Sequence, residues 1–124
     1  MSIQIRHAVI FGVSIINKTL QDLIKLEGFD EIYDWKKIHE KDCEIINSIY
    51  DMKEGSFVIE NGEDSENCFI GFILVSAFEE NGESLEECDL NFKSINYYKQ
   101  LEDNLKRLGL PKLKPSIYAV TLVH

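Results

Sequence analysis

The segment CFIGFILVSAF, residues 68–78, is apolar on both faces of an extended chain. In a strand that is buried on one face only, apolar and polar side chains alternate, because successive side chains point to opposite faces. A run without this alternation is typical of a strand that is covered on both sides. Residues 68–78 are therefore predicted to form a central strand of a sheet.

Residues 3–16 show the alternating pattern over an unusual length and predict a second long strand. One face of this strand carries Ile3, Ile5, His7, Val9, Phe11, Val13 and Ile15. The opposite face includes Ala8, Ile10 and Gly12. Because glycine inside a strand favours a kink, we expect a bend near Gly12. Two shorter strands are predicted over residues 56–60 and 117–123, and the polar residues 61–67 between the second and third strands predict a hairpin loop.

Three helices are expected between these strands. Asn17 is a candidate N-cap for a helix that runs to Leu26 and ends at Gly28. A second helix, capped by Asp30, is predicted to continue to about Met52, because apolar residues recur there at helical spacing. A firm third helix is predicted over residues 94–108, ended by Gly109 and Pro111. Residues 84–87 match a capping box, but the apolar phase changes afterwards and predicts a break near residues 89–91.

The resulting order is β-α-α-β-β-α-β in a single α+β domain, residues 1–124. Without the additional helix, this is the order of the split βαβ, or ferredoxin-like, arrangement. That arrangement is an antiparallel sheet with helices on one face and with the first and third strands in the centre. The apolar third strand agrees with it. A different α+β sheet with the same element order is the alternative.

The net charge of −9 comes from one part of the chain. Residues 54–92, called here the acidic segment, contain 11 acidic residues and no lysine or arginine. The rest of the chain carries a small positive excess. Such a concentrated negative field repels nucleic-acid phosphates and attracts basic surfaces. Direct nucleic-acid binding is therefore not expected.

Several classes of site have no support in the sequence. No motif for a phosphate loop, a catalytic triad or a metal is present, so neither a cofactor nor a metal is predicted. No run approaches the roughly 20 apolar residues that span a bilayer, and no signal peptide is recognised. The three cysteines, Cys43, Cys68 and Cys88, are far apart and indicate reduced thiols in a cytoplasmic protein.

The favoured hypothesis is a non-enzymatic binding protein that neutralises a basic, nucleic-acid-acting protein, as immunity proteins, antitoxins and phage anti-defence proteins do. In this hypothesis, carboxylates take the place of phosphates. The expected contact residues are one cluster of five acids, a second cluster of three acids and an aromatic anchor from a tyrosine pair. They are Glu79, Glu80, Glu83, Glu86 and Glu87, then Glu63, Asp64 and Glu66, then Tyr97 or Tyr98.

Two alternatives remain open at this stage. The first is a small enzyme or small-molecule binder with a site formed by His7, Tyr118 and one acid. The more common role of a histidine on an apolar face is that of a hydrogen-bonded core residue, and no acid stands near His7 in the sequence to orient it. The second alternative is an oligomeric structural subunit, for example a homodimer that pairs through the sheet face with Ala8, Ile10 and Gly12.

Overall fold

A four-stranded antiparallel sheet organises the chain in the computed structural model, which describes residues 5–62, 66–79, 82 and 90–123. The strand order is β2-β3-β1-β4. The strands are β1 (Ile5–Ile16), β2 (Phe57–Asn61), β3 (Asn67–Phe78) and β4 (Ser116–Val123). Within the described ranges there are four α-helices and one 3-10 turn: α1 (Asn17–Leu26), α2 (Ile32–Cys43), η1 (Ile49–Asp51), α3 (Leu90–Ile95) and α4 (Tyr98–Arg107). The predicted α+β class and antiparallel sheet are confirmed.

The two long strands β1 and β3 lie side by side in the centre of the sheet. Helices α1, α2 and α4 pack on one face, where Leu20, Trp35 and Leu101 meet Phe11 and Ile70 in the main core. The central strands are buried on their other face as well, which explains why residues 68–78 lack a polar face.

The second predicted helix is too long. Helix α2 ends at Cys43, and Glu44 takes the left-handed conformation, with φ 53° and ψ 46°. Residues 45–56 then pass under the sheet, where Met52 packs with Ile10 in a second core. The guanidinium of Arg6 donates to the carbonyl oxygen of Met52 and holds this segment against β1. Helical spacing was a misleading signal here, because the same apolar residues cover a sheet face from an irregular segment.

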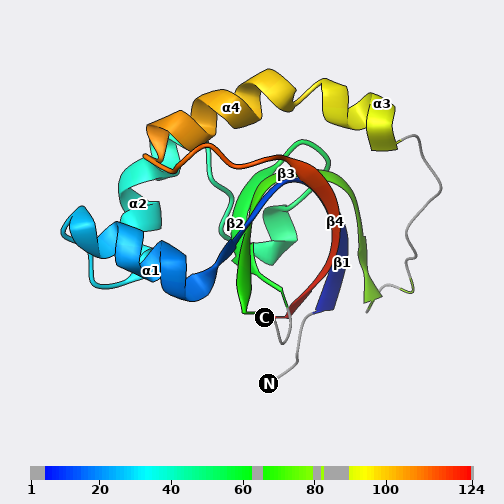
Figure 1. Ribbon diagram of the computed structural model, residues 1–124. Coiled ribbons are helices and arrows are strands. Elements are labelled where there is room, and N and C mark those ends of the chain that lie inside the picture. The colour runs from blue at the N-terminus through cyan, green and yellow to red at the C-terminus, as the bar shows by residue number, and fades with distance from the viewer. Residues whose placement is uncertain (1–4, 63–65, 80–81, 83–89, 124) are drawn as a thin grey trace.

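The course of residues 45–56 changes two expectations about the sheet. Figure 1 shows the short turn near residue 50 beneath the arch of the sheet, while α4 lies on its outer side. Helical turns are therefore not confined to one face. The face with Ala8 and Ile10 is also closed, because Ile10 is 0% exposed within the single chain. That face cannot pair two sheets, so a homodimer would need another surface.

Two glycines face each other where the central strands come closest. Gly12 on β1 is the register partner of Gly71 on β3. A Cβ atom on Gly12 would lie 2.0 Å from the carbonyl oxygen of Ile70, and one on Gly71 would lie 2.2 Å from that of Phe11. Only residues without a side chain permit this approach. The sheet arches strongly over its length (Figure 1), in keeping with the bend expected near Gly12.

Glycine ends two helices as the sequence predicts. After α1, Gly28 has φ 94°, and the amides of Gly28 and Phe29 donate to Lys25 and Ile24. After α4, Gly109 has φ 70° and the same pair of hydrogen bonds forms. Both are Schellman motifs, in which the left-handed residue lets the chain satisfy the last helical carbonyls.

Other helix boundaries differ from the predictions. Asn17 is the first residue of α1 rather than its cap, and its side chain makes no capping hydrogen bond. The third predicted helix is interrupted, because α3 ends at Ile95 and α4 begins at Tyr98. The predicted capping box at residues 84–87 lies outside the described residues. Among the helices that are described, none is long and apolar enough to cross a membrane.

Candidate functional site

Most of the predicted acidic contact residues lie outside the part of the chain that the structure describes. These are Glu63, Asp64, Glu80, Glu83, Glu86 and Glu87. Glu66 and Glu79 are described, and they flank opposite ends of β3. At roughly 3.3 Å per residue, the 12-residue strand separates them by about 40 Å along the chain. The two acidic clusters are therefore predicted to form two separate contact surfaces rather than one.

His7 has an acidic partner that its sequence neighbours did not indicate. Its Nε2 lies 2.9 Å from Oε2 of Glu79, and its Nδ1 lies 3.1 Å from Oγ1 of Thr121. Glu79 therefore supplies an acid beside His7, although no acid stands near His7 in the sequence. The strand register explains why, because His7 pairs with Thr121 on β4 and with Ala77, two residues before Glu79, on β3.

Glu79, His7 and Thr121 place a carboxylate, an imidazole and a hydroxyl in a row in space. Activated nucleophiles use the same order of groups. However, the His7 side chain is 39% exposed, and neither of the two cavities described below reaches it. Tyr118 does not join it either. Tyr118 packs against the second core beneath the sheet, on the face opposite to His7. The proposed His7–Tyr118 site is thus not assembled.

The two tyrosines of the pair differ in burial, with Tyr97 in the turn before α4 and Tyr98 at the start of that helix. Tyr97 is partly buried and stacks on Phe72, with ring centroids 5.0 Å apart and planes 15° apart. Tyr98 is 54% exposed. Of the two, Tyr98 is therefore the one that a partner can reach.

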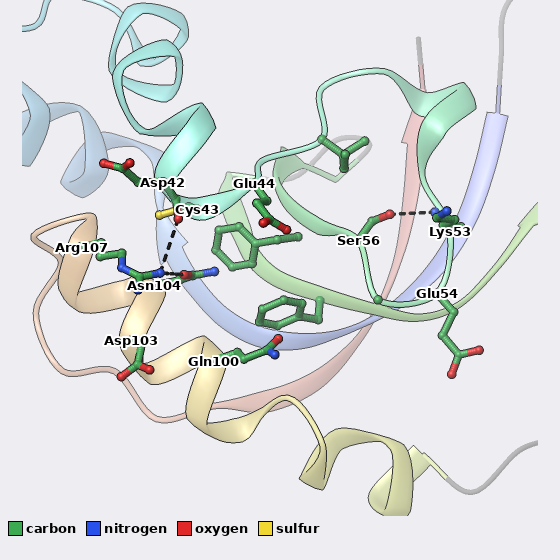
Figure 2. A pocket seen from close by; sticks show the side chains of 14 residues that line it. Asp42, Cys43, Glu44, Lys53, Glu54, Ser56, Gln100, Asp103, Asn104 and Arg107 are labelled. Carbon is green, nitrogen blue, oxygen red and sulfur yellow. Dashed lines mark hydrogen bonds between the residues drawn. The ribbon is translucent and has the colours of Figure 1, made fainter.

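A cavity of about 500 Å³ opens between the end of α2, helix α4 and the turn before β2. This space, called here the α2–α4 cavity, has the size of sites that hold small ligands. Phe57 and Phe72 form part of its lining, with ring centroids 5.0 Å apart and planes tilted by 51°. Figure 2 shows Glu44 reaching over the cavity from the end of α2 and Gln100 facing it from α4.

Asn104 is a nearly buried polar residue in the lining of this cavity. The residue is 6% exposed, and its Oδ1 accepts a hydrogen bond of 3.1 Å from NH1 of Arg107. Within the described residues, its Nδ2 has no hydrogen-bond partner, and Figure 2 shows Nδ2 directed into the cavity. Because its Nδ2 faces the cavity and has no partner among the described residues, this amide is available to donate to an acceptor of a bound molecule.

The charges around the cavity are mixed, with an acidic excess. Its lining includes the four acids Asp42, Glu44, Glu54 and Asp103 and the two bases Lys53 and Arg107. Glu54 pairs with Lys93 at 3.2 Å, and Figure 2 shows the carboxylates of Asp42 and Asp103 turned away from the interior. The Glu44 carboxylate has no ion pair or hydrogen bond with any described residue. Glu44 is therefore the acid available to a ligand.

The cysteine beside this cavity is not an activated nucleophile. Burial raises the pKa of the Cys43 thiol, and the positive charge of Arg107 only partly opposes that shift. A thiol with a raised pKa holds little of the reactive thiolate at neutral pH. The described residues contain no group of three or more His, Cys, Asp or Glu side chains placed to hold a metal ion.

A second cavity, of about 570 Å³, lies between α4 and residues 110–115. Its lining includes Tyr98, apolar side chains such as Leu101 and Leu113, and the three lysines Lys106, Lys112 and Lys114.

Comparisons with models of known protein families, with curated proteins and with solved structures each gave no match. Function is therefore inferred from this chain's own residues. The α2–α4 cavity was missed by sequence reasoning because Glu44, Phe57, Phe72 and Asn104 are far apart in the chain. The premature end of α2 brings them together, and no pattern in the sequence indicated it.

Proposed function

We propose that this protein is a small, non-enzymatic binding protein that inhibits or neutralises a basic protein acting on nucleic acids. The observation that carries the proposal is the acidic segment, in which 11 acids occur within 39 residues without a single lysine or arginine. Immunity proteins, antitoxins and phage anti-defence proteins use this kind of surface. The proposed contacts are the acids between Glu79 and Glu87, those between Glu63 and Glu66, and the exposed ring of Tyr98.

The physical basis is electrostatic complementarity. A concentrated negative surface accelerates encounter with a basic protein and holds it by ion pairs, while it repels the phosphates of competing nucleic acid. An exposed tyrosine adds apolar area of the type that dominates binding energy at interfaces. The encounter rate is therefore expected to fall steeply as salt concentration rises.

We further propose a ferredoxin-like fold and a cytoplasmic location. The strand order β2-β3-β1-β4, with β1 and β3 central and all neighbours antiparallel, supports the fold. The location is supported by Cys43 and Cys68, which are both free and buried.

The test begins with an affinity pulldown from the native host, eluted over a salt gradient. We expect one basic protein, released at moderate salt. Its affinity is then measured for the triple variant Glu83→Lys, Glu86→Lys, Glu87→Lys. The matched control is Asp22→Lys, Asp30→Lys, Asp34→Lys, which changes the net charge equally at exposed positions outside the acidic segment.

We expect the first triple variant to bind at least 100-fold more weakly and the control to lose less than 10-fold, with both remaining folded by circular dichroism. Equal losses in the two variants would mean that only net charge matters, and the proposed contact surface would be wrong. Unchanged affinity in the first variant would refute the inhibitor proposal.

A further inference from the structure

Beyond the acidic segment, the α2–α4 cavity has the features of a site for one particular chemical group. It combines an unpaired carboxylate at Glu44, an aromatic floor at Phe57 and Phe72, and the buried amide of Asn104. A planar cation fits this combination, because a carboxylate pairs with it along its edge, while the nearly buried rings of Phe57 and Phe72 form an apolar floor beneath it. The Asn104 Nδ2 can donate to an acceptor next to that cation.

We infer that the α2–α4 cavity binds the guanidinium group of an arginine side chain that the basic partner presents. Glu44 accepts hydrogen bonds from the guanidinium, which lies above the apolar floor of Phe57 and Phe72. The Asn104 Nδ2 donates to a backbone carbonyl of the partner beside the arginine. This inference rests on the proposed function, since it names the group that anchors the same basic partner.

The Asn104 side chain and the backbone of Glu44 are held in place by their own contacts. Arg107 donates to both the Asn104 side chain and the carbonyl oxygen of Asp42, at 3.1 and 3.4 Å. These bonds occupy Oδ1 of Asn104 and leave its Nδ2 directed into the cavity. The backbone at Glu44 is fixed by the end of α2, where the amide of Ile45 donates to the carbonyl of Glu40 at 3.0 Å. Groups held in advance lose less entropy on binding, and here this applies to the Asn104 amide.

The charge of the cavity discriminates against the main alternative ligand. A nucleotide could also stack on the rings and contact the amides of Asn104 and Gln100. Its phosphates, however, would approach a lining with four acids and two bases on a protein of net charge −9. Arginine is favoured over lysine because its planar fork matches the two oxygens of the Glu44 carboxylate.

The test uses nuclear magnetic resonance titration of the whole protein with N-acetyl-arginine-methylamide. The matched probe is N-acetyl-citrulline-methylamide, which has nearly the same shape without the charge. We expect saturable shifts of the side-chain amide signals of Asn104 and Gln100, with arginine binding at least 10-fold tighter than citrulline. Glu44→Gln should weaken arginine binding at least 10-fold, and Asp103→Asn, whose carboxylate points away, should change it less than threefold.

Equal binding of arginine and citrulline, shifts that map elsewhere, or tighter binding of guanosine monophosphate would each overturn the inference. Glu44→Gly is a second variant without the carboxylate, and it should retain the fold because glycine favours the left-handed conformation at this position. The inference and the proposed function can fail separately. If the partner loses affinity for the Glu83/Glu86/Glu87 variant but not for Glu44→Gln, the inhibitor proposal stands and the arginine site is wrong.

Discussion

Replacing Glu44 by glycine should stabilise the protein. Glu44 is the non-glycine residue with positive φ among the described residues, and it occupies the left-handed position that ends α2. The equivalent positions after α1 and α4 are Gly28 and Gly109. A side chain in this conformation costs roughly 1–2 kcal/mol, because its Cβ crowds the following carbonyl. Glycine avoids that cost but has about 0.5–1 kcal/mol more chain entropy to lose on folding.

The difference predicts that Glu44→Gly raises the free energy of unfolding by about 0.5–1 kcal/mol, which corresponds to a Tm about 2–4 °C higher for a chain of this size. Glu44→Ala removes the same carboxylate but keeps the left-handed strain, so it separates backbone strain from charge. Gly28→Ala is the reverse experiment. A Cβ there meets nothing within 4 Å, so its expected loss of about 1 kcal/mol comes from conformation alone.

The assay is urea unfolding followed by circular dichroism, with the slope compared among variants to verify that the two-state description holds. The reasoning is refuted if Glu44→Gly is no more stable than Glu44→Ala, or if Gly28→Ala is as stable as the wild type. A gain in stability together with a loss of arginine binding would identify Glu44 as a residue retained for binding despite its strain.

Three further predictions concern the sheet. Gly12→Ala should lower the free energy of unfolding by about 3 kcal/mol or prevent folding, because its Cβ would overlap the backbone of β3. Thermal unfolding of this variant, with Ser14→Ala as the control, checks the prediction. Burial raises the pKa of Cys68 to about 12 from an ordinary 9.0, so the stability from its neutral thiol is present below pH 9 and is lost as pH rises towards 12. Between pH 8 and 10.5, the free energy of unfolding measured in urea should fall by about 2 kcal/mol less in Cys68→Ala than in the wild type. An equal fall in the two proteins would contradict the burial argument. His7→Ala should change the free energy of unfolding by less than about 1 kcal/mol, because its contact with Glu79 is exposed and its contact with Thr121 is only partly buried, and partner affinity should be unchanged. Loss of function at a preserved Tm would instead favour the enzyme alternative.

Periodicity predicted the strands well because burial on one or two faces leaves a direct record in the sequence. Residues 68–78 and 3–16 correspond closely to β3 and β1, and Gly28 and Gly109 marked helix ends through a conformation that glycine favours. Periodicity failed after Cys43, where apolar residues at helical spacing belong to a segment under the sheet. The end of α2 at a glutamate in a left-handed conformation carries no sequence signal, because it goes against intrinsic preference.

The candidate site was less predictable than the fold for the same reason. Glu44, Phe57 and Asn104 meet only because α2 stops where it does and because α4 packs against α2. The contact between His7 and Glu79 likewise depends on the strand register, which sets residues 72 positions apart side by side. The alternation of apolar and polar residues predicts the two strands but not which residues pair across them. A turn of known length between β1 and β3 would have been needed to fix that register.

The Gly12–Gly71 contact also constrains how sequences with this fold can vary. Replacing either glycine by a larger residue would place a Cβ against the backbone of the opposite strand, not against a side chain that could be replaced by a smaller one. No compensating substitution at the partner position can relieve that overlap. In descendants of this chain that keep the arched sheet, the two positions should therefore stay glycine together, and drift at either one should coincide with a flatter sheet and a reorganised segment 45–56.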